Sequence, residues 1–492
     1  MWLLDGIAKI PATQARVSDL TLDSREVRPG SLFFALPGRS SHGLQFAAEA
    51  AARGADVVLF EPGADSAIPA LPAHVFCAPV PGLSGLVGRI ADRFFNWPSS
   101  HLHITGFTGT NGKTTCAFLL AQCLEKLGIA AAYVGTIGWG RPAALAEVTH
   151  TTPDAVTMHR TLAQLRAAGV RQVAMEVSSH ALDQGRVDGV RFQTGAFTNL
   201  TRDHLDYHGT MARYGEAKAK LFAARDLKHI VLNVGDEFGR KLAHGYSGGA
   251  SLIAVWVGAG ESGWLADRAL NATEVRIEPR GVAMTLEGSF GRLDVQTQLM
   301  GRFNAENSLV VIACLLSLGV TLADAAAALA ECQPAPGRME VVRTEARNKP
   351  LVVVDYAHTP DALRKALGAA REHCKGVLWC VFGCGGDRDT GKRAVMGAIA
   401  DELADQIIVT DDNPRSEDPE AITDGIVSGI RSRSVRVIHD RAEAIAAALK
   451  EARPPDVVLI AGKGHEDYQI YGHTRRAFSD RSEAKRLLGA AA

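Results

Sequence analysis

Short apolar, β-rich runs alternate with Ala- and Leu-rich helical runs along almost the whole chain. This alternation predicts α/β domains with largely parallel sheets, because parallel strands need a crossover between them, usually a helix. Residues 274–298 differ, since apolar and polar positions alternate there one by one, which predicts antiparallel strands inserted in the middle domain. Residues 308–320, the most apolar long run, are too few to span a bilayer and predict a buried helix.

The length of the chain points to more than one core. At roughly 100–200 residues per domain, 492 residues predict two or three domains. Segments with Pro, Gly or Ser interrupt the alternation at residues 96–100 and 333–337, and such clusters often mark boundaries. We therefore predict an α/β protein of three domains, at residues 1–98, 99–335 and 336–492.

Charge and cysteine content exclude several classes of protein. The formal net charge is -1, so no global field favours nucleic acid or a membrane, and an anionic ligand must be held by local clusters. The 8 cysteines form no CxxC pair, which argues against a zinc site and for the reduced thiols of a cytoplasmic protein. The first residues lack the pattern of a signal peptide, so we expect a cytoplasmic location without membrane insertion.

A phosphate-binding pattern follows residue 100. A short strand at residues 101–105 leads into the glycine-rich segment 106–115 and then into an apolar helix at residues 116–127. Glycines let backbone N–H groups point at an anion, and the helix N-terminus adds its dipole. We expect Lys113 to reach the outer phosphates and Thr114 to offer its hydroxyl to magnesium.

This loop does not by itself separate a ligase from a kinase, an ATPase or a GTPase. Phe107 stands where the usual pattern has glycine, while Gly109 and Gly112 keep the tight turn. The guanine-reading pattern Asn-Lys-x-Asp does not follow the loop, because residues 348–351 fail at its last position. We therefore expect ATP as the nucleotide.

Two further strand-like segments each end in a side chain suited to a metal site. Residues 172–175 lead to Glu176, and residues 194–200 lead to His204. Ligands of open α/β sheets bind beyond the carboxyl ends of strands, so both side chains are expected near the phosphate loop. Glu176 offers the oxygen ligands that magnesium prefers, whereas His204 is a candidate ligand, base or hydrogen-bonded loop residue. Lys218, on a following helix, would repel a metal ion unless it pairs with phosphate or becomes an anion.

The C-terminal third repeats this arrangement. Four segments, at residues 351–354, 378–382, 406–410 and 457–460, are strand-like. Each of them is followed directly by a cluster of polar residues. We expect these clusters to share one sheet edge. Arg388 and Arg415 can each grip a carboxylate, and Glu466 can hold an ammonium, which predicts a pocket for a zwitterion with an additional carboxylate. Three residues flank the predicted domain joint, where they can contact the nucleotide: Asn304, Asn307 and Arg338.

Five segments resemble the motifs of the Mur ligase family: residues 108–115, 175–180, 199–208, 355–360 and 461–466. The resemblance extends over essentially the whole chain. It implies an N-terminal UDP-binding domain, a central ATP-binding domain with a P-loop ATPase-type sheet, and a C-terminal Rossmann-like domain that binds an amino acid. It also implies ATP and Mg²⁺ and a part in cytoplasmic peptidoglycan precursor synthesis, and thereby in cell wall biogenesis, cell shape, cell division and the cell cycle. The sequence does not give the oligomeric state, and we expect a monomer.

The resemblance also implies roles for individual residues. The catalytic residues are Lys113, Glu176, His204 and Lys218, and the metal residues are Thr114, Glu176, His204 and Lys218, the last as the carbamate N6-carboxylysine. The ATP-binding residues are Gly109, Thr110, Asn111, Gly112, Lys113, Thr114, Thr115, Asn304, Arg338, Asp355 and His358. The nucleotide-sugar contacts are Ser24, His42, Thr151, Thr152, Ser178, Gln184 and Arg186. The amino-acid contacts are Arg388, Asp412, Asn413, Pro414, Arg415, Gly462 and Glu466.

The segment from Asp412 to Arg415 resembles the form associated with meso-diaminopimelate rather than L-lysine. Lysine lacks the second carboxylate, and a site built for a polar partner rejects an analogue without it by about 10⁴. The implied reaction is the ATP-dependent addition of meso-diaminopimelate to UDP-MurNAc-L-Ala-D-Glu through an acyl phosphate. The alternatives are a sister ligase, either the next enzyme of the family or a folylpolyglutamate synthetase, and a nucleotide-driven switch that only hydrolyses ATP.

Overall fold

The computed structural model describes residues 2–11, 13–38, 41–63, 68–147, 151–258, 266–278, 281–342, 344, 348–432 and 434–489. The chain divides into two compact units, residues 1–254 with 264–267 and residues 255–263 with 268–492. The boundaries of the three predicted domains stay a prediction. None of the helices in the described ranges has both the length and the apolar character needed to cross a membrane.

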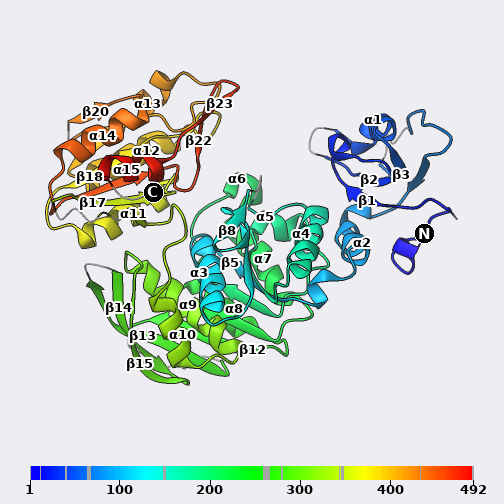
Figure 1. Cartoon of the computed structure of the whole chain (residues 1–492), viewed down its shortest axis with the longest axis horizontal. Helices are drawn as coiled ribbons and strands as arrows, with labels where there is room; N and C mark the ends of the chain where they lie inside the picture. The colour runs from blue at the N-terminus through cyan, green and yellow to red at the C-terminus, as the bar shows by residue number, and fades with distance from the viewer. Residues whose placement is uncertain are drawn as a thin grey trace. The chain divides into compact units, whose positions relative to one another are not determined.

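The first unit begins with a parallel sheet in the order β1-β2-β3-β4. Its elements are β1 (Asp19–Thr21), β2 (Ser31–Ala35), α1 (Ala47–Ala52), β3 (Ala55–Phe60), β4 (Phe76–Pro79) and α2 (Val87–Phe94). Phe34 of β2 packs in the core that includes α2, while the preceding Phe33 packs in the core that includes α1. Successive strand residues point to opposite faces, so the two helices account for a strand that is buried along its whole length (Figure 1).

The second sheet of this unit carries the phosphate loop. The strands of this sheet that lie wholly in the first unit are β5 (His103–Thr108), β6 (Ala131–Gly135), β7 (Gly138–Arg141), β8 (Ala144–Ala146), β9 (Gln172–Glu176), β10 (Thr194–Phe197) and β11 (His229–Asn233). They run in the order β11-β10-β5-β9-β6-β7-β8, parallel from β11 to β6 and antiparallel beyond. Its helices are α3 (Lys113–Lys126), α4 (Ala155–Ala167), α5 (Ser179–Asp183), α6 (Leu205–His208), α7 (Met211–Ala219) and α8 (Glu237–Gly245). Because β5 lies between β9 and β10, the segments that follow these three strands meet at one edge.

The second unit begins with an antiparallel meander, after β12 (Ser251–Val257), where the chain passes between units. The meander consists of β13 (Arg268–Glu278), β14 (Gly281–Gly288) and β15 (Gly291–Thr297), which confirms the antiparallel strands predicted for residues 274–298. Helices α9 (Phe303–Ser317) and α10 (Leu322–Ala330) follow, and α9 is buried over most of its length, as predicted from the apolar run at residues 308–320.

The rest of the second unit is a sheet with helices on both faces. The order is β16-β17-β21-β18-β19-β20. The strands are β16 (Glu340–Val342), β17 (Leu351–Asp355), β18 (Leu378–Phe382), β19 (Gln406–Val409), β20 (Val435–Val437) and β21 (Val457–Ala461), followed by the hairpin β22 (Tyr468–Tyr471) and β23 (Thr474–Ala477). The helices are α11 (Pro360–His373), α12 (Lys392–Leu403), α13 (Pro419–Val427), α14 (Arg441–Glu451) and α15 (Asp480–Leu488).

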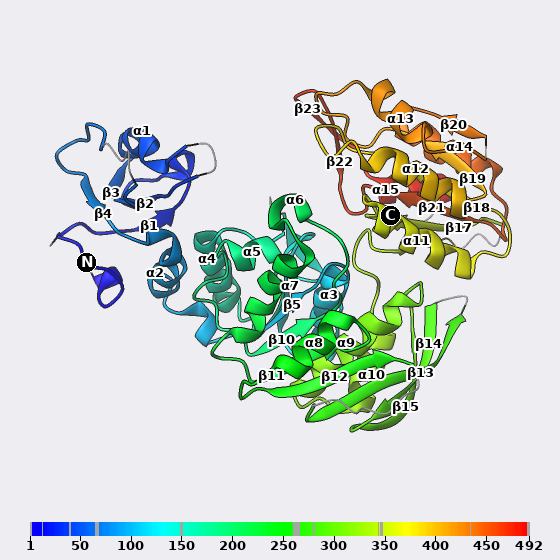
Figure 2. The same cartoon turned by 180° about the vertical axis from the view of Figure 1, so that it is seen from behind.

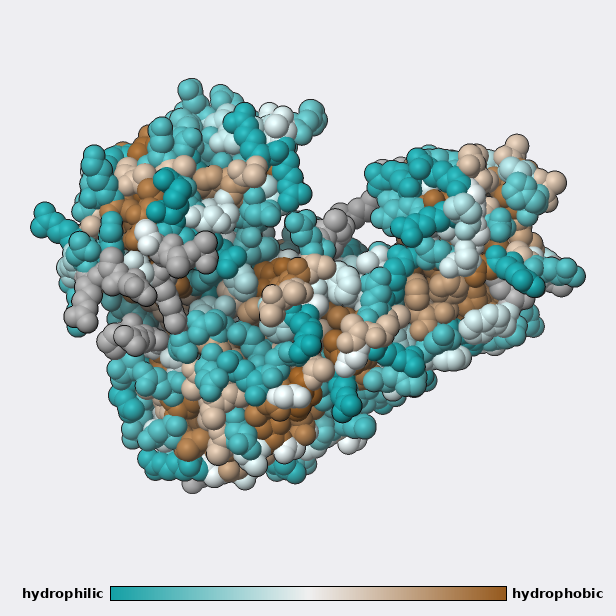
Figure 3. Space-filling view, viewed as in Figure 1, coloured by the Kyte–Doolittle hydropathy of each residue, from teal (hydrophilic) through white to brown (hydrophobic). Residues whose placement is uncertain are grey.

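Alternate residues of these strands enter two separate cores. Val353 of β17 packs in the core that α11, α12 and α13 cover, and the neighbouring Val352 packs in the core that α14 and α15 cover (Figure 2). Both faces are therefore buried, which explains why the strands read as continuous apolar runs in the sequence. On the face of the molecule shown in Figure 3, hydrophilic residues predominate and apolar ones form smaller patches between them.

Candidate active site

The phosphate loop connects the buried strand β5 to helix α3. The chain leaves β5 through Gly109, at φ 150°, and enters α3 through Gly112, at φ 86°, conformations that favour glycine. A Cβ at Gly109 would also collide with the hydroxyl of Thr198. Helix α3 begins at Lys113, three residues before the predicted start at residue 116. Lys113 and Thr114 therefore lie in its first turn, beside the positive end of the helix dipole.

The loop is held in place by contacts with the segment after β10. Thr110 N donates to the backbone oxygen of Asn199 at 2.8 Å, and Asn111 N donates to the side-chain oxygen of the same residue at 3.0 Å. Lys113 folds back over the loop, and its Nζ donates to the carbonyl oxygens of Gly109 at 2.9 Å and Thr110 at 2.8 Å. The backbone that a triphosphate would follow is thus fixed by the protein itself.

Glu176, at the end of β9, is joined to the phosphate loop. It is 1% exposed, and its Oε2 accepts from Thr114 Oγ1 at 2.9 Å and from Thr136 Oγ1 at 3.2 Å. Its Oε1 accepts from Thr136 N at 2.9 Å and from the hydroxyl of Tyr133. The predicted proximity of Glu176 to the loop is confirmed, and four donors keep its carboxylate in one orientation.

Lys218 of α7 reaches the same loop from the other side. It is 1% exposed, and its Nζ donates to Gly109 O at 2.7 Å and lies 4.2 Å from the ring centroid of Tyr214. Burial, and then the charge of Lys113, lower the pKa of Lys218 well below its ordinary value. The lowered pKa shifts Lys218 toward the neutral amine, which is the form that reacts with electrophiles.

His204 lies just before α6 in the left-handed conformation, at φ 53°. Its ring meets that of His180 edge-on, with 4.9 Å between centroids, and its Nε2 is 3.5 Å from Asp203 Oδ2. Burial lowers the pKa of His204, and burial followed by the charge of His204 lowers the pKa of His180 to about 4. Two imidazoles that are neutral at pH 7 thus face each other beside the loop.

Oxygen donors for magnesium adjoin the phosphate loop. Within the described ranges, no group of three or more His, Cys, Asp or Glu side chains could hold a metal ion. The hydroxyl of Thr114 and the carboxylate of Glu176 are nevertheless 2.9 Å apart. Mg²⁺ prefers oxygen ligands and often shares substrate phosphates with one or two carboxylates. The donor set therefore fits a magnesium ion that also binds phosphate oxygens.

Four of the predicted nucleotide-sugar residues form a network beside Glu176. Thr152 Oγ1 donates to the backbone oxygen of Glu176 at 3.1 Å and accepts from Ser178 N at 3.3 Å. Arg186 donates from Nη1 to Thr152 O at 3.1 Å and from Nη2 to Gln184 Oε1 at 2.6 Å. Burial lowers the pKa of Arg186, whose guanidinium remains charged. The network provides one cation and several polar groups close to the phosphate loop.

The other three predicted nucleotide-sugar residues have separate partners. Thr151 accepts from a neighbouring threonine hydroxyl at 3.2 Å. Ser24, on the N-terminal part of the unit, donates to Glu49 Oε2 at 2.8 Å. His42 accepts from Leu44 N at 3.0 Å through Nδ1, and its Nε2 lies 2.9 Å from a backbone carbonyl oxygen. Both ring nitrogens of His42 are engaged within the protein, and its contact with a nucleotide sugar stays a prediction.

In the second unit, the four predicted polar clusters do lie at one sheet edge. The parallel neighbours β17, β21, β18 and β19 all end there, which confirms the prediction. Strand β21 lies between β17 and β18 although it follows both in the sequence. Such a reversal of strand order leaves room for a ligand beyond the carboxyl ends of the strands.

Two arginines lie at this edge. Arg415 is in the left-handed conformation, at φ 55°, and its backbone pairs with the hairpin β22–β23 by donating to Ile470 O at 3.0 Å and accepting from Gly472 N at 2.7 Å. Its Nη1 donates to Gly386 O at 2.8 Å. Arg388 is exposed, and its Nη1 donates to the preceding carbonyl oxygen at 3.1 Å. Both guanidinium groups keep further N–H donors for a carboxylate.

The acidic and amide groups of the predicted pocket lie at the ends of β19 and β21. Asp412 is 8% exposed, and a Cβ at Gly462, at φ 119°, would stand 2.7 Å from its Oδ2. Asn413 is 2% exposed, and its Nδ2 donates to Glu466 Oε2 at 2.9 Å. Pro414 continues this segment toward Arg415. The structure thus brings together the residues predicted for the amino acid.

The remaining predicted ATP residues belong to the second unit. Burial raises the pKa of Asp355 to about 6, and burial lowers the pKa of His358. The guanidinium of Arg338 lies 4.5 Å from the ring centroid of Tyr356. Asn304 is 3% exposed and its Nδ2 donates to the backbone oxygen of Met300 at 2.7 Å. Their contacts with a nucleotide stay a prediction.

Some residues that build the site received no individual role in the sequence analysis, although three of them lie in the segments that resemble family motifs. They are Tyr133, Thr136, Tyr214 and, within those segments, His180, Asn199 and Lys463. Tyr133 reaches Glu176 because β6 pairs with β9, and no local sequence pattern predicts that pairing. A signal for Lys463 did exist, since it lies between two glycines directly after a predicted strand.

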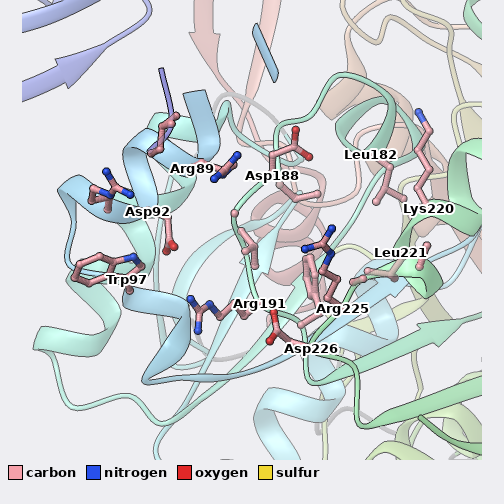
Figure 4. Close-up of a pocket in the computed structure, with 18 residues that line it drawn as sticks. Arg89, Asp92, Trp97, Leu182, Asp188, Arg191, Lys220, Leu221, Arg225 and Asp226 are labelled. Atoms are coloured by element: carbon pink, nitrogen blue, oxygen red, sulfur yellow. The ribbon is translucent and has the colours of Figure 1, made fainter. Parts of the chain in front are cut away.

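A cavity of about 650 Å³ lies elsewhere in the first unit, and none of the predicted site residues lines it. Its walls include residues of α2, residues 187–192, residues 220–221 and residues 223–226, and Figure 4 shows Arg89, Arg191 and Arg225 around it. Acidic side chains share the same walls. The cavity therefore does not mark the predicted site.

Three family models match the chain in succession. "Mur ligase family, catalytic domain" matches residues 16–95, "Mur ligase middle domain" matches residues 107–315, and "Mur ligase, glutamate ligase domain" matches residues 337–464. Together they account for most of the chain.

Similar proteins extend over nearly the full length. The UDP-N-acetylmuramoyl-L-alanyl-D-glutamate–2,6-diaminopimelate ligase of Ectopseudomonas mendocina is 48% identical over 484 residues, or 98% of this chain and 97% of the relative. The protein of the same name from Chromobacterium violaceum is 48% identical over 473 residues, or 95% of this chain and 93% of the relative. A solved structure of a ligase with this name has a TM-score of 0.68 and 34% identity, covering 98% of this chain and 97% of its own. The Mycobacterium tuberculosis folylpolyglutamate synthase shares the fold, with a TM-score of 0.65 at 17% identity, covering 83% of this chain and 96% of its own.

Proposed function

This chain belongs to the Mur ligase family, and from that premise we propose that it adds meso-diaminopimelate to UDP-MurNAc-L-Ala-D-Glu at the expense of ATP. Relatives at 48% identity carry the name of this ligase. The observation that carries the proposal is the placement of Arg388 and Arg415 at the same sheet edge as Glu466. Two cations and one anion there suit an amino acid with an additional carboxylate.

We also propose the setting of this reaction. Residues 1–98 bind the UDP moiety, residues 99–335 bind ATP, and residues 336–492 bind diaminopimelate. The enzyme acts as a cytoplasmic monomer on small-molecule precursors of peptidoglycan, with no nucleic-acid partner, and its product serves cell wall biogenesis and cell division.

The proposed chemistry uses the residues of the two sites in turn. Lys113 and the backbone of the phosphate loop neutralise and orient the triphosphate. Magnesium, when bound, offsets the charge of the transferred phosphoryl group, and Thr114, Glu176, His204 and the carbamate of Lys218 are the groups proposed to hold it.

The D-Glu side-chain carboxylate takes the γ-phosphoryl group of ATP and becomes an acyl phosphate. Arg388, Arg415 and Glu466 orient diaminopimelate so that one amine stays free to attack the acyl carbon. The C–N bond forms, the C–O bond to phosphate breaks, and the amine loses a proton. Positioning of two bound reactants accounts for much of the expected rate gain.

A coupled assay tests the function directly. Purified protein is given ATP, magnesium and UDP-MurNAc-L-Ala-D-Glu, with diaminopimelate, lysine or glutamate offered separately, and ADP release is followed. We expect turnover with diaminopimelate and none comparable with the other two, because only diaminopimelate matches both arginines and Glu466. Equal rates with lysine would contradict the pocket, and ATP hydrolysis that ignores the amino acid would favour a nucleotide switch instead.

Carbamylation of Lys218 is open to a separate test. The lowered pKa of Lys218 favours the neutral amine, which adds to CO₂ and releases a proton, so we expect the carbamate to form as the pH rises and to be lost as the pH falls. In ¹³C-bicarbonate, a carbamate resonance should appear in the NMR spectrum of the protein. It should vanish in Lys218→Ala and persist in Lys220→Ala, whose lysine is exposed and pairs with Asp183 at 2.7 Å. A resonance that survives Lys218→Ala would rule out this site.

A further inference from the structure

Lys463 is a fully buried cation in the second unit to which the proposed chemistry gives no role. Its side chain is 0% exposed. It follows β21 and stands between Gly462, at φ 119°, and Gly464, at φ 54°. Glu466 N donates to Lys463 O at 2.9 Å, which closes a turn and places the two side chains on the same side. A buried ammonium must have hydrogen-bonding or charged partners, so the contacts of Lys463 indicate which site it supports.

Both hydrogen-bond acceptors of Lys463 are residues of the proposed amino-acid pocket. Its Nζ donates to Glu466 Oε2 at 3.0 Å and to Asn413 Oδ1 at 3.2 Å. The Nζ atom of Lys463 also lies over the ring of Tyr468, 5.4 Å from its centroid, within the range of a cation–π contact. Lys463 thus connects the segment after β19 with the segment after β21 through two groups expected to meet the substrate.

These contacts determine which way the Asn413 amide points. Ile470 N also donates to Asn413 Oδ1, at 3.0 Å, so two N–H donors face the same atom of the amide. Only the oxygen can accept from both, and the NH₂ group must therefore face Glu466, to which it donates at 2.9 Å. One of its two N–H bonds is used there, and the second remains available.

The same contacts involve only one of the two carboxylate oxygens of Glu466. Oε2 takes both the Lys463 and the Asn413 donors. Among the described residues, no hydrogen bond reaches Oε1. A carboxylate tied to the protein by one oxygen can direct the other at a ligand.

We propose that Lys463 is a positioning residue for the amino-acid substrate. It presents Glu466 Oε1 to the substrate ammonium and an Asn413 N–H to a neighbouring carboxylate. The Lys463–Glu466 pair carries no net charge, so this end of the pocket suits a zwitterionic group better than an isolated ammonium. This inference rests on the proposed function, since it concerns the same pocket.

The first test replaces Lys463 by methionine, which has a similar length and no charge. We expect the KM for diaminopimelate to rise by about 30- to 100-fold, the low end of the loss found when one member of a buried charge pair is removed. The KM values for ATP and for UDP-MurNAc-L-Ala-D-Glu should stay within about twofold, because a positioning residue acts on one substrate. Lys450→Met, at an exposed lysine of α14, is the matched control and should change none of the three.

A double-mutant cycle separates positioning from a general loss of structure. If Lys463 acts through Glu466, then Lys463→Met in combination with Glu466→Gln should raise the KM no further than Glu466→Gln alone. The double variant also removes both charges together, so it keeps the test available if Lys463→Met by itself fails to fold.

Multiplicative effects of the two substitutions, or an unchanged KM for diaminopimelate in Lys463→Met, would overturn the inference. Failure of the unmodified protein to use diaminopimelate would instead overturn the proposed function. The two failures are therefore distinguishable in the same assay.

Discussion

Replacement of Arg415 by alanine is expected to lower kcat/KM for meso-diaminopimelate by about 10³- to 10⁴-fold, because the carboxylate that distinguishes this substrate would lose its partner. The backbone of Arg415 is held by Ile470 and Gly472, so the loop should keep its course when the guanidinium is removed. Binding of ADP should change by less than about twofold, since no nucleotide group is proposed to meet this side chain. Steady-state kinetics and calorimetric titration with ADP measure the two effects.

Arg415→Ala should also lower the specificity for diaminopimelate over lysine. Lysine has no second carboxylate for Arg415 to bind, so its low kcat/KM should change little. The ratio of kcat/KM for diaminopimelate to that for lysine should therefore fall. Arg431→Ala, at an exposed arginine of the same unit, is the control and should leave both rates unchanged. A fall in the rates with diaminopimelate and lysine by the same factor would show that Arg415 supports the fold of the pocket rather than the recognition of a carboxylate.

Replacement of Arg441 by methionine is expected to destabilise the second unit by about 3–5 kcal/mol, the cost of leaving one charge of a buried pair unpaired. Arg441 and Asp480 are both 0% exposed in their side chains, and two N–H groups of Arg441 donate to the Asp480 carboxylate at 2.6 and 2.8 Å. Arg441 also donates to Ala461 O at 2.9 Å, at the end of β21. Removal of the guanidinium leaves a buried carboxylate and a buried carbonyl without this donor. Urea titration followed by circular dichroism measures the free energy of unfolding.

The control for this prediction is an ion pair with the same geometry at the surface. Arg364 also donates two N–H groups to one carboxylate, that of Glu402, both at 2.8 Å. The side chains of this pair are 49% and 57% exposed, so Arg364→Met should cost about 1 kcal/mol or less. Equal losses of stability in the two variants would contradict the claim that burial decides the difference.

Much of the fold could be predicted because it depends on local periodicity. The alternation at residues 274–298 gave the meander β13–β15, and the apolar run at residues 308–320 gave most of α9. Strand β18 was predicted with its observed bounds at residues 378–382. The start of α3 was predicted late, because the polar residues Lys113 to Thr115 interrupt the apolar pattern while the backbone is already helical.

The candidate site was predictable to the extent that its residues directly follow strands. Glu176 and the four C-terminal clusters were found in this way, since the carboxyl ends of parallel strands share one edge. The residues that hold these groups in place were not identified from the sequence. Thr136 reaches Glu176 through a turn after β6, and Lys463 reaches Asn413 across neighbouring loops, so both contacts depend on which strands are adjacent.

The sequence by itself determined the α/β class, the phosphate loop and the kinds of charge available to bind ATP and an amino acid, because periodicity and covalent neighbourhood are recorded locally in the chain. Only the tertiary structure decided that β21 lies between β17 and β18, that the Lys218 amine is buried against Gly109, and that Lys463 ties one oxygen of Glu466. The physical reason is that burial and hydrogen bonding depend on contacts between segments tens of residues apart. Packing of the whole sheet selects those contacts, and no local pattern specifies them.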